Sequence, residues 1–394
     1  MVDKRGQWWT SEDKMVANPF KPTAGKMPPI LIGREDVLAD FQEGLDNGAG
    51  APGRLMLITG QRGFGKTVLL TEIGRMAHAQ GWDVVADTAS AGMCGRMIEV
   101  LDSGHLSMEA EIAPSIGIGN VARAQLGSVR IGSNVTAVNL RSAIMRRLAK
   151  LPEGKGILFT VDESQTASRD EMVSLATTVQ HVIRDEDMND LPDDKKHGIA
   201  LVFAGLPSMV DRLINDDVLT FLRRCMREDL GPIRIVDTKN AFIATVEDSG
   251  LRISEEVAQT AARATDGYPY MVQLVGYYMW QTAQRRHSAK IVASDVERAI
   301  ADAQMAFQDA VCDPAYRGLS ESQRAVLLAM LPDYPEPSRI SDIVARTGAS
   351  RSWISRCRDS LVQAHVIDTP ARGRLSFAIP QFAEYLADID ARLR

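Results

Sequence analysis

Up to residue 236, the chain alternates short apolar runs with longer segments whose apolar residues recur at helical spacing. The short runs are four to six residues long and predict buried strands, at 55–59, 82–86, 157–161, 199–204 and 233–236. Helices are expected before and between these strands, at 37–45, 66–80, 93–101, 137–151 and 169–185. Strands that alternate with helices predict a parallel sheet covered by helices on both faces, so we expect an α/β fold.

Beyond residue 238 only helical periodicity continues, with helices expected at 238–249, 254–265, 270–285 and 294–311. A new unit begins at Leu319, with helices predicted at 322–331, 340–347 and 351–364 and then an extended Arg-Gly-Arg segment. Three helices and a short ribbon predict a winged helix-turn-helix. The expected domains are an irregular segment at 1–28, the α/β domain at 29–237, a helical domain at 238–314 and the winged helix at 318–394.

The segment 103–134 interrupts the α/β pattern with five glycines and many polar residues. A long insertion of this kind inside a domain is either functional or unstructured. Alternating residues at 116–118 and 129–131 favour a protruding hairpin, and an irregular insertion is the alternative.

The composition narrows the class of protein. A chain of 394 residues predicts two to four domains of about 100–200 residues each, and 45% hydrophobic with 24% charged residues excludes a disordered chain. No run of 18 apolar residues exists and the first ten residues lack an apolar stretch, so we expect neither a membrane span nor a secretory signal. The four cysteines are too far apart for a disulfide framework or a zinc site, which favours a cytoplasmic protein. The net charge of −6 excludes a chain that is basic throughout, although it allows a local basic patch.

Residues 60–67, here called the phosphate loop, match the P-loop pattern in full and lie between a predicted strand and a predicted helix. The glycines let backbone N–H groups surround phosphate oxygens, Lys66 neutralises the β- and γ-phosphates, and the Thr67 hydroxyl can bind Mg²⁺. A nucleoside triphosphate such as ATP is therefore the expected ligand. The predicted nucleotide contacts here are Gly60, Gln61, Arg62, Gly63, Phe64, Gly65, Lys66, Thr67 and Val68.

Two carboxylates follow the apolar strand at 157–161. We expect Asp162, at the tip of the strand, to hold Mg²⁺ together with Thr67. Glu163 is the predicted general base that activates the attacking water. Acids at a strand end also serve as simple caps, but a P-loop earlier in the chain favours the catalytic interpretation.

Several other residues are candidates for nucleotide contacts. Arg223 and Arg224 supply positive charge before the predicted fifth strand, and one of them could reach a nucleotide on a neighbouring subunit or pair with nearby acids on a solvated helix. Arg62 faces either the γ-phosphate or solvent. Two further candidates, Ile32 and Gly33, could pack on the adenine with Arg34 fixing the loop, or Arg34 simply begins the helix.

These motifs resemble those of AAA+ ATPases over residues 18 to 390. The residues that carry the resemblance are Asn18-Pro19-Phe20, the segment 28–35 that ends in Gly33-Arg34-Glu35, and the two phosphate motifs. The origin-recognition initiator clade and the related archaeal-type STAND ATPases are the most similar groups. The resemblance implies ATP and Mg²⁺ as cofactors, an α-helical lid, self-association on ATP binding and a DNA-binding winged helix. It also implies that the segment 266–270 opens the sensor-2 helix.

The sequence departs from this family at two positions that read the γ-phosphate. After the fourth strand, Ala204-Gly205-Leu206-Pro207 offers no polar sensor side chain. Tyr270 stands at or near the place where initiators have the sensor-2 arginine. Both losses predict a slowly hydrolysing switch in place of a motor, with Tyr270 as a candidate nucleotide contact.

The third helix of the predicted winged helix has an apolar face and a polar face. Six arginines against two aspartates between 346 and 374 give a local basic excess of four. These groups suit phosphates and base edges. The predicted DNA contacts are Arg351, Ser352, Ser355, Arg356, Arg372 and Arg374.

Three functions remain open from the sequence. The first is an ATP-controlled switch that binds double-stranded DNA, like an origin-recognition initiator. The second is a STAND-type signalling ATPase whose winged helix makes protein contacts, which the acidic total charge favours. The third is a helper ATPase of a mobile element.

Overall fold

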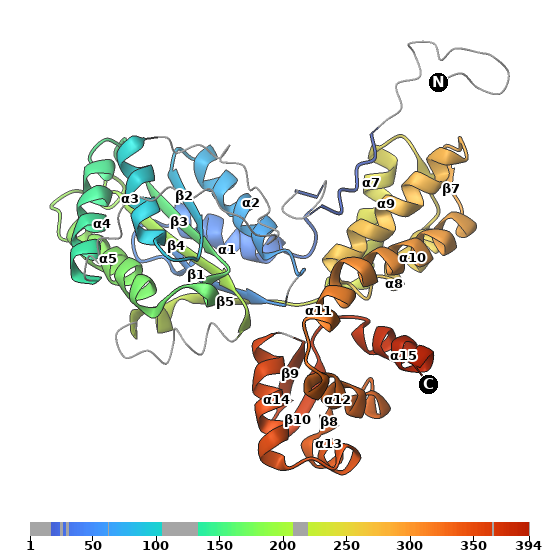
Figure 1. Cartoon of the computed structure of the whole chain (residues 1–394). Helices are drawn as coiled ribbons and strands as arrows, with labels where there is room; N and C mark the ends of the chain where they lie inside the picture. Colours follow the sequence, from blue (N-terminus) through green and yellow to red (C-terminus); the bar gives the residue numbers. More distant parts are fainter. Residues whose placement is uncertain are drawn as a thin grey trace. The chain divides into compact units, whose positions relative to one another are not determined.

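The chain divides into two compact units in the computed structural model (Figure 1). The sheet unit is Gly33–Gly231, and the C-terminal unit combines Met1–Ile32 with Pro232–Arg394. The structure describes residues 17–23, 27–28, 31–61, 63–104, 133–207, 220–364 and 366–393.

Five parallel strands form the centre of the sheet unit, in the order β2-β3-β4-β1-β5. Their bounds are β1 (Leu55–Gly60), β2 (Asp83–Thr88), β3 (Gly156–Asp162), β4 (Gly198–Gly205) and β5 (Met226–Leu230). The predicted α/β fold with a parallel sheet is confirmed. Since β4 pairs with both β1 and β3, its carboxyl end lies between the phosphate loop and the carboxylates Asp162 and Glu163 at the end of β3.

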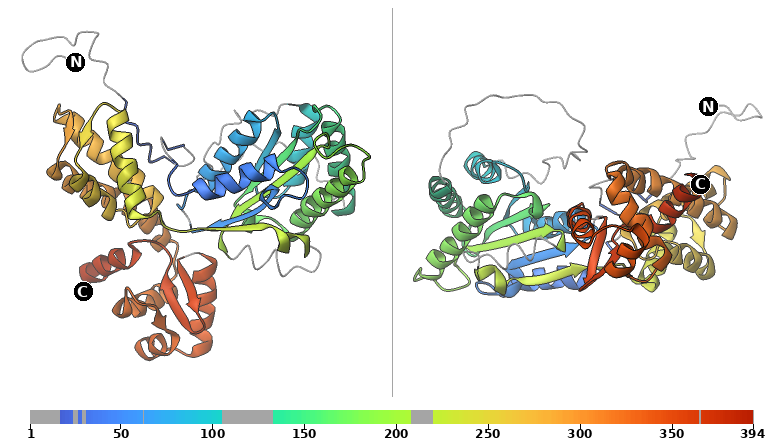
Figure 2. Two further views of the ribbon diagram at one scale, coloured as in Figure 1. Left: turned by 180° about the vertical axis from the view of Figure 1, so that it is seen from behind. Right: turned by 60° about the horizontal axis from the view of Figure 1, so that its bottom comes forward.

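Helices cover both faces of this sheet (Figure 2). They are α1 (Glu35–Asp46), α2 (Lys66–Ala79), α3 (Met93–Ser103), α4 (Ser133–Leu148) and α5 (Arg169–Asp187), with 3-10 turns η1 (Pro52–Arg54), η2 (Ser164–Thr166) and η3 (Thr220–Arg224). Alternate strand residues such as Leu57, Phe159 and Phe203 pack with α3, α4 and α5 in one buried cluster. Because the central strands are buried on both faces, they read as continuous apolar runs.

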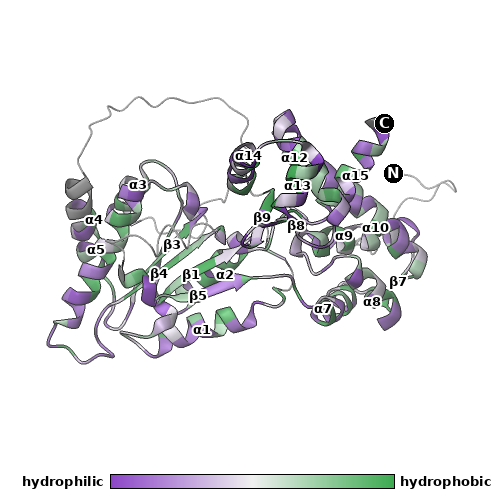
Figure 3. Ribbon diagram, turned by 90° about the horizontal axis from the view of Figure 1, so that it is seen from below, coloured by the Kyte–Doolittle hydropathy of each residue, from purple (hydrophilic) through white to green (hydrophobic). Residues whose placement is uncertain are grey.

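The predicted fifth strand at 233–236 is wrong. The fifth strand is β5, which pairs with β1, whereas α7 begins at Ile235. The sequence of β5, Met-Arg-Glu-Asp-Leu, is polar, and most of the strand has the hydrophilic colour in Figure 3. An edge strand exposes side chains, here those of Arg227 and Asp229. Ile233 is buried for another reason, since it belongs to the C-terminal unit and its N–H donates to the Gly267 carbonyl over 2.7 Å.

The first part of the C-terminal unit consists of helices close to those predicted at 238–249, 254–265, 270–285 and 294–311. They are α7 (Ile235–Asp248), α8 (Glu255–Arg263), α9 (Pro269–Arg285) and α10 (Ala293–Phe307). A parallel pair of two-residue strands, β6 (Arg252–Ile253) and β7 (Lys290–Ile291), was not predicted because such short strands leave no periodic signal. Phe20, from the N-terminal segment, is buried against Gly276 of α9 and contacts the Phe242 ring edge-on.

The last part of the chain continues from α10 through a π-helical turn, η4 (Gln308–Cys312), into α11 (Asp313–Arg317). Three helices follow, α12 (Glu321–Met330), α13 (Ile340–Thr347) and α14 (Arg351–Gln363), with the 3-10 turn η5 (Leu331–Asp333) after α12. An antiparallel sheet in the order β8-β10-β9 accompanies them, made of β8 (Ser338–Arg339), β9 (Ile367–Ala371) and β10 (Arg374–Phe377). A final helix, α15 (Phe382–Leu393), was not predicted, and its buried Phe382 and Leu386 join the core.

Three expectations drawn from composition concern the described part of the chain. Within it, no helix is both long and apolar enough for a membrane span, and no cluster of three potential metal-ligating side chains occurs. The four cysteines are buried free thiols.

Most of the predicted insertion 103–134 lies outside the described residues, which resume at α4.

Candidate functional site

The phosphate loop connects the end of β1 to the start of α2. Gly63 and Gly65 have φ angles of 80° and 85°, a left-handed conformation that glycine adopts without strain. The Lys66 side chain is buried, with its residue 6% exposed, and its Nζ donates to the carbonyls of Gly60 and Gln61 over 2.8 and 3.0 Å. The first turn of α2 therefore presents backbone N–H groups and a positive helix end next to a buried ammonium, which suits phosphate oxygens.

The two predicted magnesium ligands lie in direct contact. Thr67 Oγ1 donates to Asp162 Oδ2 over 2.5 Å, and the backbone N–H of Glu163 donates to Asp162 Oδ1 over 2.8 Å. Burial raises the pKa of Asp162, and the hydrogen bonds from Thr67 and Glu163 oppose this shift. A hydroxyl and a carboxylate are the hard oxygen ligands that Mg²⁺ takes alongside phosphate and water.

Glu163 occupies a strained backbone position at the end of β3. Its φ of 49° is left-handed, which costs a non-glycine residue on the order of 1–3 kcal/mol and persists only where surrounding bonds impose it. The Thr166 N–H donates to the Glu163 carbonyl over 2.8 Å, and the buried Ser164 hydroxyl donates to the Val161 carbonyl over 2.9 Å. The turn η2 therefore fixes the direction in which the Glu163 side chain leaves the sheet.

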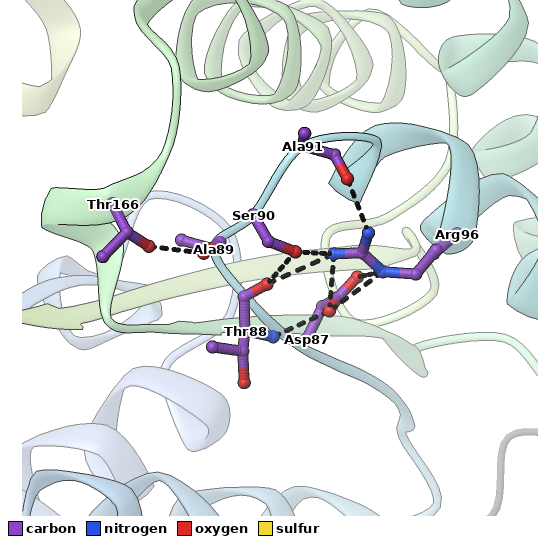
Figure 4. A network of polar contacts seen from close by, with 7 residues as sticks. All are labelled: Asp87, Thr88, Ala89, Ser90, Ala91, Arg96 and Thr166. Atoms are coloured by element: carbon purple, nitrogen blue, oxygen red, sulfur yellow. Dashed lines mark hydrogen bonds and ion pairs between the residues drawn. The ribbon is translucent and has the colours of Figure 1, made fainter. Parts of the chain in front are cut away.

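A polar network braces η2 from the side of β2 (Figure 4). Arg96 on α3 donates to both carboxylate oxygens of Asp87, over 3.0 Å from Nε and from Nη2, and to the Ala91 carbonyl over 3.0 Å. This fixes the connection between β2 and α3, whose Ala89 carbonyl accepts a hydrogen bond from the Thr166 hydroxyl of η2. The segment that carries Glu163 is thus held from a neighbouring strand as well as from β3.

Gln165 contacts the Glu163 carboxylate and was not among the predicted site residues. Its Nε2 donates to Glu163 Oε2, and its Oε1 accepts the Leu206 N–H over 3.2 Å. Leu206 follows β4 in the segment where we found no polar sensor side chain. The polar run that Asp162 begins could have drawn attention to Gln165, but its second contact depends on strand order.

Arg34 is a buried cation, 7% exposed, that contacts the phosphate loop. It donates to the Phe64 carbonyl over 3.3 Å and to the carbonyls of Gly33 and Gly231 over 2.9 Å each. Burial lowers the pKa of Arg34 from its usual high value. Because Gly33 and Gly231 are the first and last residues of the sheet unit, Arg34 ties the phosphate loop to both points where the chain passes between units.

The remaining residues predicted to contact the nucleotide, apart from Arg62 within the phosphate loop itself, are not brought next to that loop by any contact described above. Arg223 and Arg224 are exposed on η3, which leads into β5, and an action on a neighbouring subunit stays a prediction. Arg62 lies outside the described residues. Both Ile32 and Tyr270 belong to the C-terminal unit, where the Tyr270 ring contacts Phe307, so their role also stays a prediction.

The predicted DNA contacts lie on α14 and on the β9–β10 hairpin. Ser350 caps α14 by accepting the Trp353 N–H over 3.3 Å. The apolar face predicted for this helix is buried, as expected. Four of the predicted contacts are exposed: Arg351, Ser352, Arg356 and Arg372. Ser355 is half-buried and accepts a hydrogen bond from Arg358 over 3.1 Å.

Arg374 has an unpredicted neighbour. It lies directly opposite Arg339 in the pairing of β10 with β8, so two cations face each other across the strands. One guanidinium nitrogen of Arg374 donates to the Pro337 carbonyl over 3.2 Å. Like charges directly opposite each other are unfavourable unless an anion or solvent screens them.

Comparison with known proteins identifies the fold of the chain but says little about its function. Residues 309–386 match the family described as a domain of unknown function, DUF8462, and no curated protein matches the chain. The Aeropyrum pernix ORC2 protein, solved in ADPNP-ADP complexes, is similar with a TM-score of 0.59 and 14% identity, over 97% of this chain and 99% of that one. Cdc6p from Pyrobaculum aerophilum has a TM-score of 0.49 and 13% identity, over 95% and 98% of the two chains. The Thermotoga maritima RuvB branch migration motor has a TM-score of 0.45 and 15% identity, over 90% and 95%. The match to ORC2, together with the parallel sheet and its phosphate loop, shows that the chain has the AAA+ P-loop α/β fold.

Proposed function

We propose that the protein binds Mg²⁺-ATP and hydrolyses it slowly, as a switch that couples its nucleotide state to DNA binding by the C-terminal region. The observation that carries the nucleotide part is the contact between Thr67 Oγ1 and Asp162 Oδ2. These residues are 95 positions apart, and the fold brings together a P-loop hydroxyl and a carboxylate at the end of a neighbouring strand. That pair is the arrangement by which P-loop NTPases hold Mg²⁺.

Each residue has a distinct role in the proposed reaction. Lys66 and the N–H groups of the phosphate loop bind the β- and γ-phosphates, and Thr67 and Asp162 orient the metal, which supplies charge neutralisation at the phosphates when bound. Glu163 accepts a proton from the attacking water. Arg223 and Arg224, exposed before β5, are the candidates for stabilising charge on a neighbouring subunit's γ-phosphate.

We propose slow turnover because the residues at the carboxyl end of β4 are apolar. Ala204 and Leu206 are fully buried and apolar, so no side chain at these two positions can read the γ-phosphate. Tyr270, at or near the place where initiators have the sensor-2 arginine, cannot supply a cation to stabilise transition-state charge. The expected turnover is therefore below the ~1 s⁻¹ lower end of ordinary enzymes.

We further propose that α12, α13, α14 and the sheet β8-β10-β9 form a winged helix that binds double-stranded DNA. Arg351 and Arg356 on α14 are exposed, as is Arg372 at the tip of the β9–β10 hairpin. The opposed pair Arg339 and Arg374 extends this basic surface and favours an anionic partner. Phosphates along a duplex would supply the missing negative charge.

The alternative is a STAND-type ATPase whose winged helix contacts protein. Two of the six arginines counted in the predicted basic excess are already paired within the chain. Arg346 forms two hydrogen bonds with Asp333, of 2.5 and 2.6 Å, and Arg358 pairs with Asp359 over 2.7 Å. This reduces the charge left for DNA, and it is the observation that favours the alternative.

Two binding measurements on the full chain test the proposal. Isothermal titration should show that Lys66→Ala abolishes ATP binding, and unchanged affinity would remove the phosphate-loop assignment. Fluorescence anisotropy across a salt series should show that replacing Arg372 and Arg374 by alanine flattens the slope of log affinity against log salt by up to about two units, since each neutralised phosphate contributes roughly 0.9. If wild type binds no duplex at low salt, the protein-contact alternative replaces DNA binding.

A further inference from the structure

The end of β4 has a polar partner that comes from another strand. Leu206, which is 1% exposed, has a backbone N–H that points to Gln165 Oε1 at 3.2 Å. Gln165 lies in η2, directly after β3, and its other amide atom contacts Glu163. One carboxamide therefore spans the gap between the proposed general base and the neighbouring strand.

The orientation of the Gln165 amide follows from these two contacts. A backbone N–H can only donate and an ionised carboxylate can only accept, so the amide must present its oxygen to Leu206 and its NH₂ group to Glu163. Rotating the amide by 180° would set two donors against each other at Leu206 and two acceptors at Glu163. The bridge is thus directional, and it leaves the Glu163 carboxylate with a fixed donor.

The far end of the bridge is anchored close to the phosphate loop. Gly205, the residue before Leu206, lies opposite Thr59 of β1 in the parallel pairing of β4 with β1. Thr59 immediately precedes Gly60, where the phosphate loop begins. The position of a side chain bonded to the Leu206 N–H is therefore fixed relative to β1, the strand that leads into the phosphate loop.

We infer that Gln165 is a positioning residue that holds the Glu163 carboxylate at a fixed distance from the phosphate loop. This inference rests on the proposed ATPase function. A glutamate side chain has several rotatable bonds, and confining it to one rotamer costs conformational entropy. The bridge meets that cost during folding, so that the base is already oriented when nucleotide is bound.

Two variants separate the halves of the bridge. Gln165→Ala removes both contacts. Gln165→Glu has the same shape and keeps an acceptor for the Leu206 N–H, but it places a second carboxylate against Glu163 in place of a donor. Gln42→Glu is the matched control, because Gln42 Nε2 also donates to a carboxylate, that of Asp46, over 2.9 Å on α1.

The experiment measures Mg²⁺-ATP affinity by titration calorimetry, steady-state phosphate release and the pH dependence of kcat for the full chain. For Gln165→Ala we expect ATP affinity within twofold of wild type and kcat about tenfold lower, because misplacing a catalytic group costs rate more than binding. For Gln165→Glu we expect the acidic limb of the kcat profile to move to higher pH, because adjacent carboxylates raise one another's pKa. Asp162, whose carboxyl interacts with both Glu163 and Lys66, is unchanged in this variant. Gln42→Glu should match wild type in all three measurements.

The outcomes are distinguishable. If the wild type hydrolyses ATP and both Gln165 variants have the same kcat and pH profile as the wild type, the positioning role is overturned. The ATPase proposal then stays intact. An increase in kcat for Gln165→Ala also overturns it, since the bridge would then restrain the base. Absence of wild-type turnover despite ATP binding overturns the proposed hydrolysis and this inference together. If Gln165→Ala fails to fold, the isosteric Gln165→Glu decides: lower kcat at unchanged ATP affinity supports the positioning role, and unaltered kcat overturns it.

Discussion

Replacing Arg34 by methionine is expected to destabilise the sheet unit by about 2–3 kcal/mol. The guanidinium makes three hydrogen bonds to carbonyls, two of 2.9 Å and one of 3.3 Å. A bond to a charged group contributes about 1.5–3 kcal/mol, so the two short bonds contribute about 3–6 kcal/mol together. Methionine avoids the cost of burying the guanidinium, which offsets part of this loss. In a unit of about 200 residues, 1 kcal/mol shifts Tm by about 2–4 °C, so Tm should fall by about 5–10 °C.

Thermal unfolding of the full chain, followed by circular dichroism, measures this effect. Arg75→Met in the same unit is the control, because Arg75 is exposed and pairs with Glu72 on the surface of α2, so the Tm of this variant should change by less than about 2 °C. Arg34→Lys should give an intermediate Tm, since an ammonium keeps the charge but cannot reproduce the planar fork. A Tm of Arg34→Met equal to that of Arg75→Met would refute the argument that Arg34 ties the phosphate loop to both ends of the unit.

Two further predictions concern contacts within the C-terminal unit, an ion pair and the packing of the N-terminal segment. The hydrogen bonds from Arg346 lower the pKa of Asp333 to about 2, below its unfolded value of 3.8, so their stabilisation is present above pH 3.8 and is lost as the pH falls through 2. Asp333→Asn should therefore cost about 1 kcal/mol at pH 7 by chemical denaturation, with wild type and variant converging towards pH 2. A constant difference across this range would contradict the pair's role. Gly276→Ala should destabilise by about 1–2 kcal/mol and release the N-terminal segment to limited proteolysis, since an added Cβ would lie 2.3 Å from the buried Phe20 ring. Gly95→Ala on α3 is the control. Among the described residues, nothing beyond its own helix backbone lies within 4 Å of the added Cβ, so this variant should be neutral or slightly stabilising.

The sequence predicted the central strands of the sheet and one edge strand, β2, but not the other edge strand, β5. β1, β3 and β4 are buried on both faces, so nearly every position in these strands is apolar and the sequence shows a continuous apolar run. β5 pairs along one side only and carries Arg227, Glu228 and Asp229, whose charges hide it from a search for apolar runs. The apolar residues at 233–236 are explained by packing in the next unit.

The site was predictable where its chemistry is local and unpredictable where it depends on strand order. The phosphate loop and the carboxylates after β3 are contiguous motifs, and Thr67 meets Asp162 as expected. The contact of Gln165 with Leu206 arises only because β4 lies beside β3. The contact of Arg34 with Gly231 joins residues 197 positions apart. No spacing rule in the sequence encodes either contact.

Phosphate release from Mg²⁺-ATP by wild type and Glu163→Gln, measured beside ATP affinity, tests the central claim most directly. We expect equal affinity, wild-type turnover below ~1 s⁻¹ and at least ~10²-fold slower turnover in the variant, the usual contribution of a general base. Equal turnover of the two proteins, or a wild type that binds no ATP, would contradict the account.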